Sequence, residues 1–168
     1  MTAPSHGRAA VVVADERSPH DSPMAHIDLD RWRQLAEDAL TAEAAVGELT
    51  LTFVDASEIA SLNAEYMGTI GPTDVLSFPM DDDSPPGVPT LLGDVVISPA
   101  VAASQYAEHA GTFDDEIALL VVHGVLHVLG FDHAVAGQAA MMRRRELELL
   151  ELHCWAGSAP VGFRQVHD

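Results

Sequence analysis

Apolar and polar residues recur along this chain in patterns that predict four strands and five helices. Residues 48–54 (ELTLTFV) alternate apolar and polar positions with β-branched side chains, as a strand with one buried face does. Short apolar runs predict three further strands, over residues 9–14, 74–79 and 92–97. Helices are expected over residues 29–45, 56–66, 99–109, 113–129 and 136–155. This mixed order predicts an α+β fold, with one mixed sheet of about four strands packed with about five helices.

Polar residues in front of the apolar repeats predict where the helices begin. Asp28, Ser98 and Thr112 each stand where a side-chain oxygen can accept a hydrogen bond from the first helical turn. Asp55 and Glu58 have the spacing of a capping box and are expected to open the second helix.

Length and composition are those of one domain spanning residues 1–168. A chain of 168 residues that is 48% hydrophobic can bury a substantial core. Residues 1–8 and 157–168 are expected to be flexible ends, and the acidic, proline-rich residues 81–90 are expected to form a mobile loop. The sequence contains no apolar run of membrane-spanning length and no signal-peptide pattern. With Cys154 as its one cysteine, the chain is expected to work in the cytoplasm.

The charge balance is strongly acidic. Twenty-six carboxylates face eight arginines and no lysine, which gives a formal net charge of −18. Such a surface repels phosphate backbones, so neither a DNA partner nor an anionic membrane is expected. Any RNA substrate must then be held by particular cationic groups and not by the surface as a whole.

Two histidines on one buried helix suggest a metal site. The helix over residues 113–129 is apolar almost all round, and it carries His123 and His127 one turn apart, with their Cβ atoms roughly 5–6 Å apart. Gly130 permits the chain to reverse after the helix, which brings His133 back over the same face. Three neutral imidazoles would bind one Zn²⁺ per chain and leave one coordination position open. A water in that position would have its pKa lowered towards about 7, and would be a nucleophile at neutral pH.

The alternative is that these histidines are ordinary core residues joined by hydrogen bonds. Three buried imidazoles with no shared partner would leave several unsatisfied polar groups, at roughly 1–3 kcal/mol each, so we favour the metal site. The spacing is also that of the metzincin proteases, H-E-x-x-H-x-x-G-x-x-H. Gly124 stands where those proteases carry their general-base glutamate, which argues against peptide hydrolysis.

Residues 123–133 (HGVLHVLGFDH) closely resemble the signature H-G-x-L-H-x-x-G-[FY]-D-H of the bacterial endoribonuclease YbeY family. Two upstream segments, GPTDVLSFPMD at residues 71–81 and LLGDVVISP at residues 91–99, are similar to the same family. The resemblance covers about residues 49–150, with the same order of elements.

This resemblance implies a zinc-dependent, single-strand-specific endoribonuclease in 16S rRNA 3′-end maturation and ribosome quality control. It implies that His123, His127 and His133 bind the metal, and that the partners are ribosomal RNA, the small ribosomal subunit and ribosomal proteins. Many family members carry an arginine before the glycine that precedes the P-T-x-V-L-S-F segment, and Met67 occupies that position here. Another group must then meet the phosphate, unless the protein does without one.

Further candidate site residues each have a structural alternative. Asp132 is a candidate proton acceptor or orienting group for a ligand, and otherwise bonds the local backbone. Ser77 is a catalytic candidate on the strand expected near the metal, although a strand serine more often satisfies backbone groups. Asp94 either faces the cleft or makes a structural hydrogen bond, and Thr73 and Asp74 are expected to fix the turn before the strand.

Positive charge is densest at residues 143–145. Successive helical residues point about 100° apart, so these three arginines cannot form one flat patch. Arg144 is the candidate phosphate contact among them, and it is spaced to pair with Glu148. The other histidines show no ligand spacing and are expected at the surface: His6, His20, His26, His109, His153 and His167.

Three functions remain open on the sequence. The first is a zinc-dependent endoribonuclease. The second is a metallohydrolase of another class, such as a peptidase. The third is a non-catalytic ribosome-assembly factor with a structural zinc, whose acidic surface meets basic ribosomal proteins.

Overall fold

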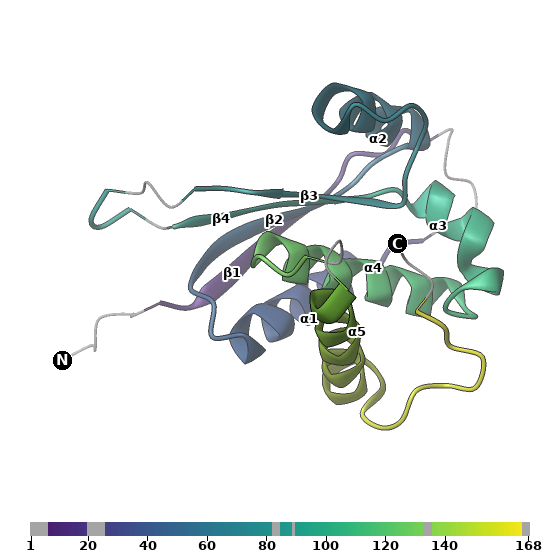
Figure 1. Ribbon diagram of the computed structural model, residues 1–168. Coiled ribbons are helices and arrows are strands. Elements are labelled where there is room, and N and C mark those ends of the chain that lie inside the picture. Colours follow the sequence, from purple (N-terminus) through teal and green to yellow (C-terminus); the bar gives the residue numbers. More distant parts are fainter. Residues whose placement is uncertain (1–6, 20–25, 82–84, 89, 133–135, 166–168) are drawn as a thin grey trace.

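The structure is a computed structural model that describes residues 7–19, 26–81, 85–88, 90–132 and 136–165. Within these residues the chain forms a four-stranded mixed sheet and five α-helices (Figure 1), which confirms the α+β prediction. No helix among them is both long and apolar enough to cross a membrane.

The elements follow one another in the predicted order. The strands are β1 (Ala9–Asp15), β2 (Gly47–Phe53), β3 (Val75–Pro79) and β4 (Leu91–Ile97). The α-helices are α1 (Leu29–Ala42), α2 (Ala56–Leu62), α3 (Pro99–Gln105), α4 (Phe113–Val128) and α5 (Ala136–Leu150). Short helical turns extend three of them: the π-turns η1 (Asn63–Met67) and η3 (Glu151–Trp155), and the 3₁₀ turn η2 (Tyr106–Glu108).

The sheet has the strand order β1-β2-β4-β3. β1 pairs with β2 and β2 pairs with β4 in parallel, whereas β3 runs antiparallel to β4 and forms one edge. In Figure 1, α1, α4 and α5 lie on one side of the sheet and α2 lies on the other. Strand β2 has one apolar face, which α1, α4 and α5 cover. Its alternate residues Leu49, Leu51 and Phe53 are fully buried, as the alternating pattern predicts.

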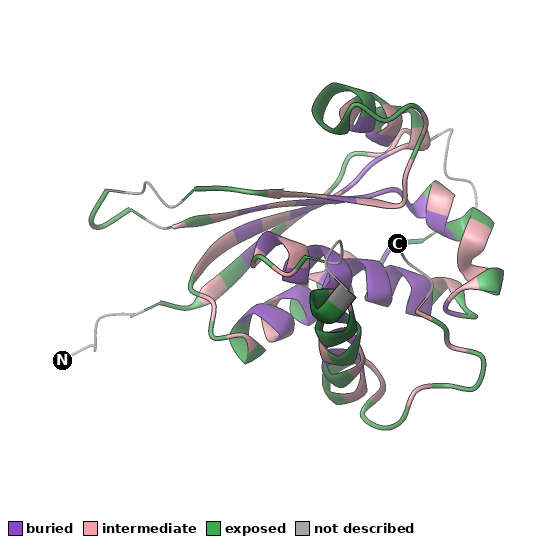
Figure 2. Ribbon diagram, in the orientation of Figure 1, coloured by how far each residue is buried: buried purple, intermediate pink, exposed green. Residues whose placement is uncertain are grey.

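Helix α4 is the centre of the molecule, and it is buried along nearly its whole length (Figure 2). It packs against β3 and β4 and also contacts α1, α3 and α5. The Thr112 hydroxyl accepts a hydrogen bond from the Asp115 N–H at 3.1 Å, which confirms the predicted N-cap. A helix with no exposed face of its own is held in place by its neighbours, so side chains on it are positioned with little freedom.

One predicted cap is wrong. Asp55 does precede α2, but its side chain makes no capping bond within that helix. Its carboxylate instead accepts a hydrogen bond from the Ser18 N–H at 2.9 Å, and so ties the start of α2 to the chain that follows β1. The tertiary partner has replaced the local one, which spacing along the sequence does not reveal.

Candidate metal centre and substrate cleft

The two histidines of α4 lie side by side. The ring centroids of His123 and His127 are 4.5 Å apart and the ring planes meet at 74°. His123 is 6% exposed, and His127 is half-buried one turn further along the helix. His133, the third predicted ligand, lies outside the described residues, and the described part of the chain gathers no set of three metal-binding side chains.

Glu146 of α5 lies directly behind His123. Its Oε2 is 3.3 Å from His123 Nδ1, and both side chains are almost fully buried. A carboxylate at this distance favours the tautomer with the proton on Nδ1, so the Nε2 lone pair remains available to a metal ion.

This arrangement fits a metal site. Histidines that bind a metal almost always donate their second ring N–H to a carboxylate, carbonyl or water, which fixes the ring and raises its basicity. His123 has such a carboxylate, and His127 has its ring next to that of His123 on the same helical face. The two described ligands are therefore compatible with a zinc ion, to which a histidine from the following segment would add a third nitrogen.

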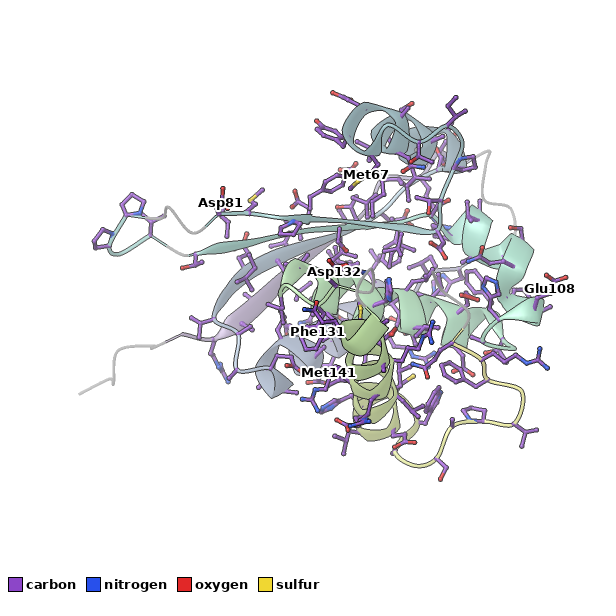
Figure 3. All side chains as sticks on the ribbon, in the orientation of Figure 1. Met67, Asp81, Glu108, Phe131, Asp132 and Met141 are labelled. Atoms are coloured by element: carbon purple, nitrogen blue, oxygen red, sulfur yellow. The ribbon has the colours of Figure 1, made fainter. Side chains whose placement is uncertain are left out.

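The chain reverses after α4 as predicted. Gly130 has a positive φ of 101°, its N–H bonds the His127 carbonyl at 3.0 Å, and the Phe131 N–H bonds the Leu126 carbonyl at 3.0 Å. These paired bonds form a Schellman motif, which satisfies the last carbonyls of the helix. Asp132 follows directly and is exposed in the turn between α4 and α5 (Figure 3).

A cleft of about 700 Å³ opens beside the histidine pair. It lies between α4, the edge strand β3 with the loop before it, and the α3–α4 connection. The described residues that line it are Met67, Pro72, Thr73, Asp74, Val75, Leu76, Ser77, Pro79, Val101, Gln105, His109, His123 and His127. These residues include neither arginine nor lysine, so the cleft has no permanently cationic wall among them.

Ser77 and Gly124 join the edge strand to the histidine helix. The Ser77 hydroxyl donates a hydrogen bond to the Gly124 carbonyl at 3.0 Å. A Cβ atom at position 124 would lie only 2.5 Å from Val95 Cγ1 on β4. Glycine is therefore needed here for helix and sheet to approach closely, and a glutamate at this position would meet the sheet. Close packing against β4 thus explains why residue 124 is glycine and not the glutamate of the proteases.

The turn before β3 is held by Asp74. One carboxylate oxygen accepts from the Val75 N–H at 2.8 Å, and the other accepts from Gln105 Nε2 at 2.8 Å. The second bond ties the turn to α3 across the cleft. Asp94, the other acidic candidate, accepts a hydrogen bond from the Thr50 hydroxyl on the neighbouring strand and lies outside the lining of the cleft. Asp94 thus makes the structural hydrogen bond that was expected as the alternative to facing the cleft.

Arg144 is exposed on α5 and lies outside the residues that line the cleft. Arg144 has the spacing to pair with Glu148, but Glu148 bonds Arg145 at 2.9 Å. Arg145 also bonds Glu43, and this carboxylate raises the pKa of the guanidinium above its usual value. Among the three arginines, Arg145 is therefore engaged in joining α5 to the end of α1.

Two acidic residues and one histidine of the site were not identified from the sequence. Glu146 and Glu116 carry no motif, and His109 was expected at the surface, yet its side chain is only 19% exposed and lines the cleft. Its Nδ1 lies 3.4 Å from Oε2 of Glu116, which is fully buried. Their pairing runs across the turn between α3 and α4, so helical spacing gives no sign of it.

An α+β fold with paired imidazoles at a cleft defines a candidate metal-dependent enzyme. A sequence model of the family described as Endoribonuclease YbeY matches residues 19–153. The chain therefore belongs to the YbeY family, and the resemblance found in its motifs is confirmed.

Individual relatives agree with this assignment. The chain is 44% identical over 111 residues to Endoribonuclease YbeY of Mycolicibacterium gilvum, a stretch that covers 62% of each protein. It is 39% identical over 139 residues to Endoribonuclease YbeY of Moorella thermoacetica, covering 77% of this chain and 89% of the relative. The match to the first of these spans less than two thirds of that relative's length.

A solved structure has the same fold. The solution structure of TM1509 from Thermotoga maritima superposes with a TM-score of 0.54 and covers 87% of this chain and 91% of its own. The two sequences are 22% identical, so the likeness concerns the fold alone. The fold of this chain is thus similar to that of an experimentally determined protein.

Proposed function

We propose that this protein is a zinc-dependent, single-strand-specific endoribonuclease of the cytoplasm that matures the 3′ end of 16S rRNA and takes part in ribosome quality control. One observation carries the proposal: two neighbouring helical histidines, one of them buried and supported by Glu146, border the cleft of a chain that belongs to the YbeY family. The relatives that match are named as endoribonucleases.

His123 and His127, with His133 as the third proposed ligand, would hold the ion. When bound, zinc supplies a Lewis acid and lowers the pKa of a coordinated water to near neutrality. The protein's own residues have the remaining tasks. Glu146 fixes the His123 ring, and Asp132, next to the third ligand, is the proposed proton acceptor for the attacking water.

Ser77 has a different place in this proposal. Its hydroxyl lies at the cleft but donates to the Gly124 carbonyl, so it sets the distance between β3 and α4. A direct catalytic contact from Ser77 would require this bond to be exchanged for one to the substrate. We therefore assign it to positioning of the cleft wall.

Substrate and partners follow from the same proposal. Ribosomal RNA of the small subunit is the substrate, and basic ribosomal proteins are the partners that a net charge of −18 would attract. Arg144 is exposed on α5 and is a proposed phosphate contact outside the cleft. Repulsion from the surface as a whole favours substrates presented by the ribosome over free duplexes.

The same charge favours one other function, a non-catalytic assembly factor with a structural zinc. The two functions differ in a direct assay. Purified, zinc-loaded protein is incubated with a single-stranded RNA that spans the 3′ end of the 16S precursor, and casein serves as the substrate for peptidase activity. His127→Ala is the test variant and His153→Ala is the control. His153 does not line the cleft, and its Nδ1 lies 3.8 Å from a carboxylate oxygen of Asp38.

The endoribonuclease proposal predicts cleavage of the RNA and not of casein. His127→Ala is expected to lose more than about 100-fold in rate, because loss of a ligand should exceed the 10-fold to 100-fold cost of losing its outer partner. His153→Ala is expected to match the wild type. Cleavage that His127→Ala leaves intact would contradict the proposal, and no cleavage with one bound zinc would leave the assembly factor.

A further inference from the structure

A second histidine–carboxylate pair lies at the same cleft and consists of residues other than the proposed metal ligands. His109 follows the 3₁₀ turn η2, and Glu116 is in the first turns of α4. Nδ1 of His109 and Oε2 of Glu116 are 3.4 Å apart, and His109 lines the cleft together with His123 and His127.

The burial of Glu116 determines what its carboxylate requires from His109. A carboxylate with no exposed surface is costly unless a partner compensates its charge. Nδ1 is the His109 ring nitrogen nearer to Glu116, so the imidazolium form of His109 places its positive charge beside the buried carboxylate. In that form Nε2, on the opposite edge of the ring, also carries a proton. The backbone adds a second restraint, because the Arg164 N–H bonds the His109 carbonyl at 3.1 Å.

The C-terminal segment is itself anchored next to this pair. Trp155 Nε1 donates to the Asp115 carboxylate at 2.8 Å, and the rings of Trp155 and Phe163 meet edge to face at 4.7 Å. These contacts hold the chain that leads to Arg164 against the start of α4. His109 is thus restrained through its side chain, by Glu116, and through its backbone, by the end of the chain.

The composition of the cleft shows what such a histidine is needed for. RNA cannot be held without donors to its phosphates, and most proteins supply arginine or lysine. No lysine exists in this sequence, and the described lining of the cleft contains no arginine. Four arginines are already engaged by carboxylates: Arg17, Arg31, Arg33 and Arg145. Met67, which also lines the cleft, carries no charge.

We propose that the imidazolium form of His109, paired with Glu116, is a substrate-binding group that donates a hydrogen bond from Nε2 to a backbone phosphate of RNA in the cleft. The inference rests on the proposed function, since it concerns the same substrate. It assigns no part in the chemical step to His109, which would act on binding and leave the metal ligands unchanged.

The test uses the full chain, zinc and a short fluorescein-labelled oligouridylate, with binding measured by anisotropy and cleavage measured by its kinetic constants. His109→Asn is the decisive variant. Its amide nitrogen lies near the position of Nδ1, so a polar contact with Glu116 is kept, whereas nothing replaces Nε2. His109→Ala removes both, and His153→Ala is the matched control because it breaks a histidine–aspartate pair away from the cleft.

Both His109 variants are expected to bind the oligonucleotide roughly tenfold or more weakly, as loss of a hydrogen bond to a charged group predicts. KM should rise by a similar factor with kcat nearly unchanged, because the contact serves binding and not the transition state alone. Zinc content should remain that of the wild type. His109→Asn should keep the wild-type melting temperature even where His109→Ala lowers it.

Two results separate this inference from the function on which it rests. If the wild type cleaves RNA and His109→Asn binds and cleaves it with unchanged constants, His109 has a structural role alone and the inference is overturned. If the wild type binds RNA without cleaving it, and both His109 variants weaken that binding, the inference holds and the nuclease proposal fails.

Discussion

Glu146 and His123 are twenty-three residues apart in the chain, and Oε2 of the first lies 3.3 Å from Nδ1 of the second inside the protein. The contact joins α5 to α4 at the point where the predicted metal site begins. A metal site would explain this buried polar pair, because a carboxylate that holds one ring nitrogen orients the other to bind a metal.

Removal of this carboxylate should weaken metal binding. Glu146→Gln is expected to lower zinc affinity about 10-fold, and Glu146→Ala up to about 100-fold, because the amide oxygen still accepts from Nδ1 but carries no charge. Competition with a chromogenic chelator measures the affinity. Glu148→Gln is the control on the same helix, since Glu148 is half exposed and pairs with Arg145. Equal affinities for Glu146→Ala and Glu148→Gln would refute the role of Glu146.

Gly124 should be needed for packing. Gly124→Ala is expected to destabilise the protein by about 1–3 kcal/mol, because the new methyl group would lie 2.5 Å from Val95 Cγ1. Urea denaturation measures the change. Gly137→Ala on α5 is the matched control, since no atom lies within 4 Å of its added Cβ, and it should be neutral or slightly stabilising.

The clash with Val95 can be isolated in a double-mutant cycle. In a Val95→Ala background, Gly124→Ala should cost less than in the wild type, because the methyl groups that it would meet are gone. The same cost in both backgrounds would show that the requirement for glycine arises elsewhere.

The thiol of Cys154 should be unreactive in the folded protein. Burial raises its pKa above the usual value of 9.0, and the nearby guanidinium of Arg31 offsets this only in part. Because the thiolate is the reactive form, a disulfide reagent at pH 8 should label the native protein more slowly than the urea-unfolded chain. Equal rates in the two states would show that the segment around Cys154 does not pack against the core.

The sequence predicted what depends on local period and spacing. The alternation in β2, the apolar character of α4, the pairing of His123 with His127 and the reversal at Gly130 are all features of neighbouring residues, and the structure shows each one. The order of elements followed from them, and with it the α+β class.

Contacts between residues far apart in the sequence could not be predicted from local period and spacing. The Glu146–His123 and Glu116–His109 pairs exist because α4 is enclosed by other elements, and nothing near these residues in the sequence marks them as partners. For the same reason, Asp55 was assigned to a local cap although it bonds Ser18, and Gly124 was interpreted through chemistry before its approach to Val95 was visible.

The most direct test of the central claim is to titrate metal-free protein with zinc while RNA cleavage is followed. The account predicts no cleavage without zinc, a rise with added zinc that ends at one equivalent per chain, and no saturable rise for His123→Ala or His127→Ala. Cleavage by metal-free protein, or a wild-type response that both variants share, would contradict a metal centre built on these two histidines.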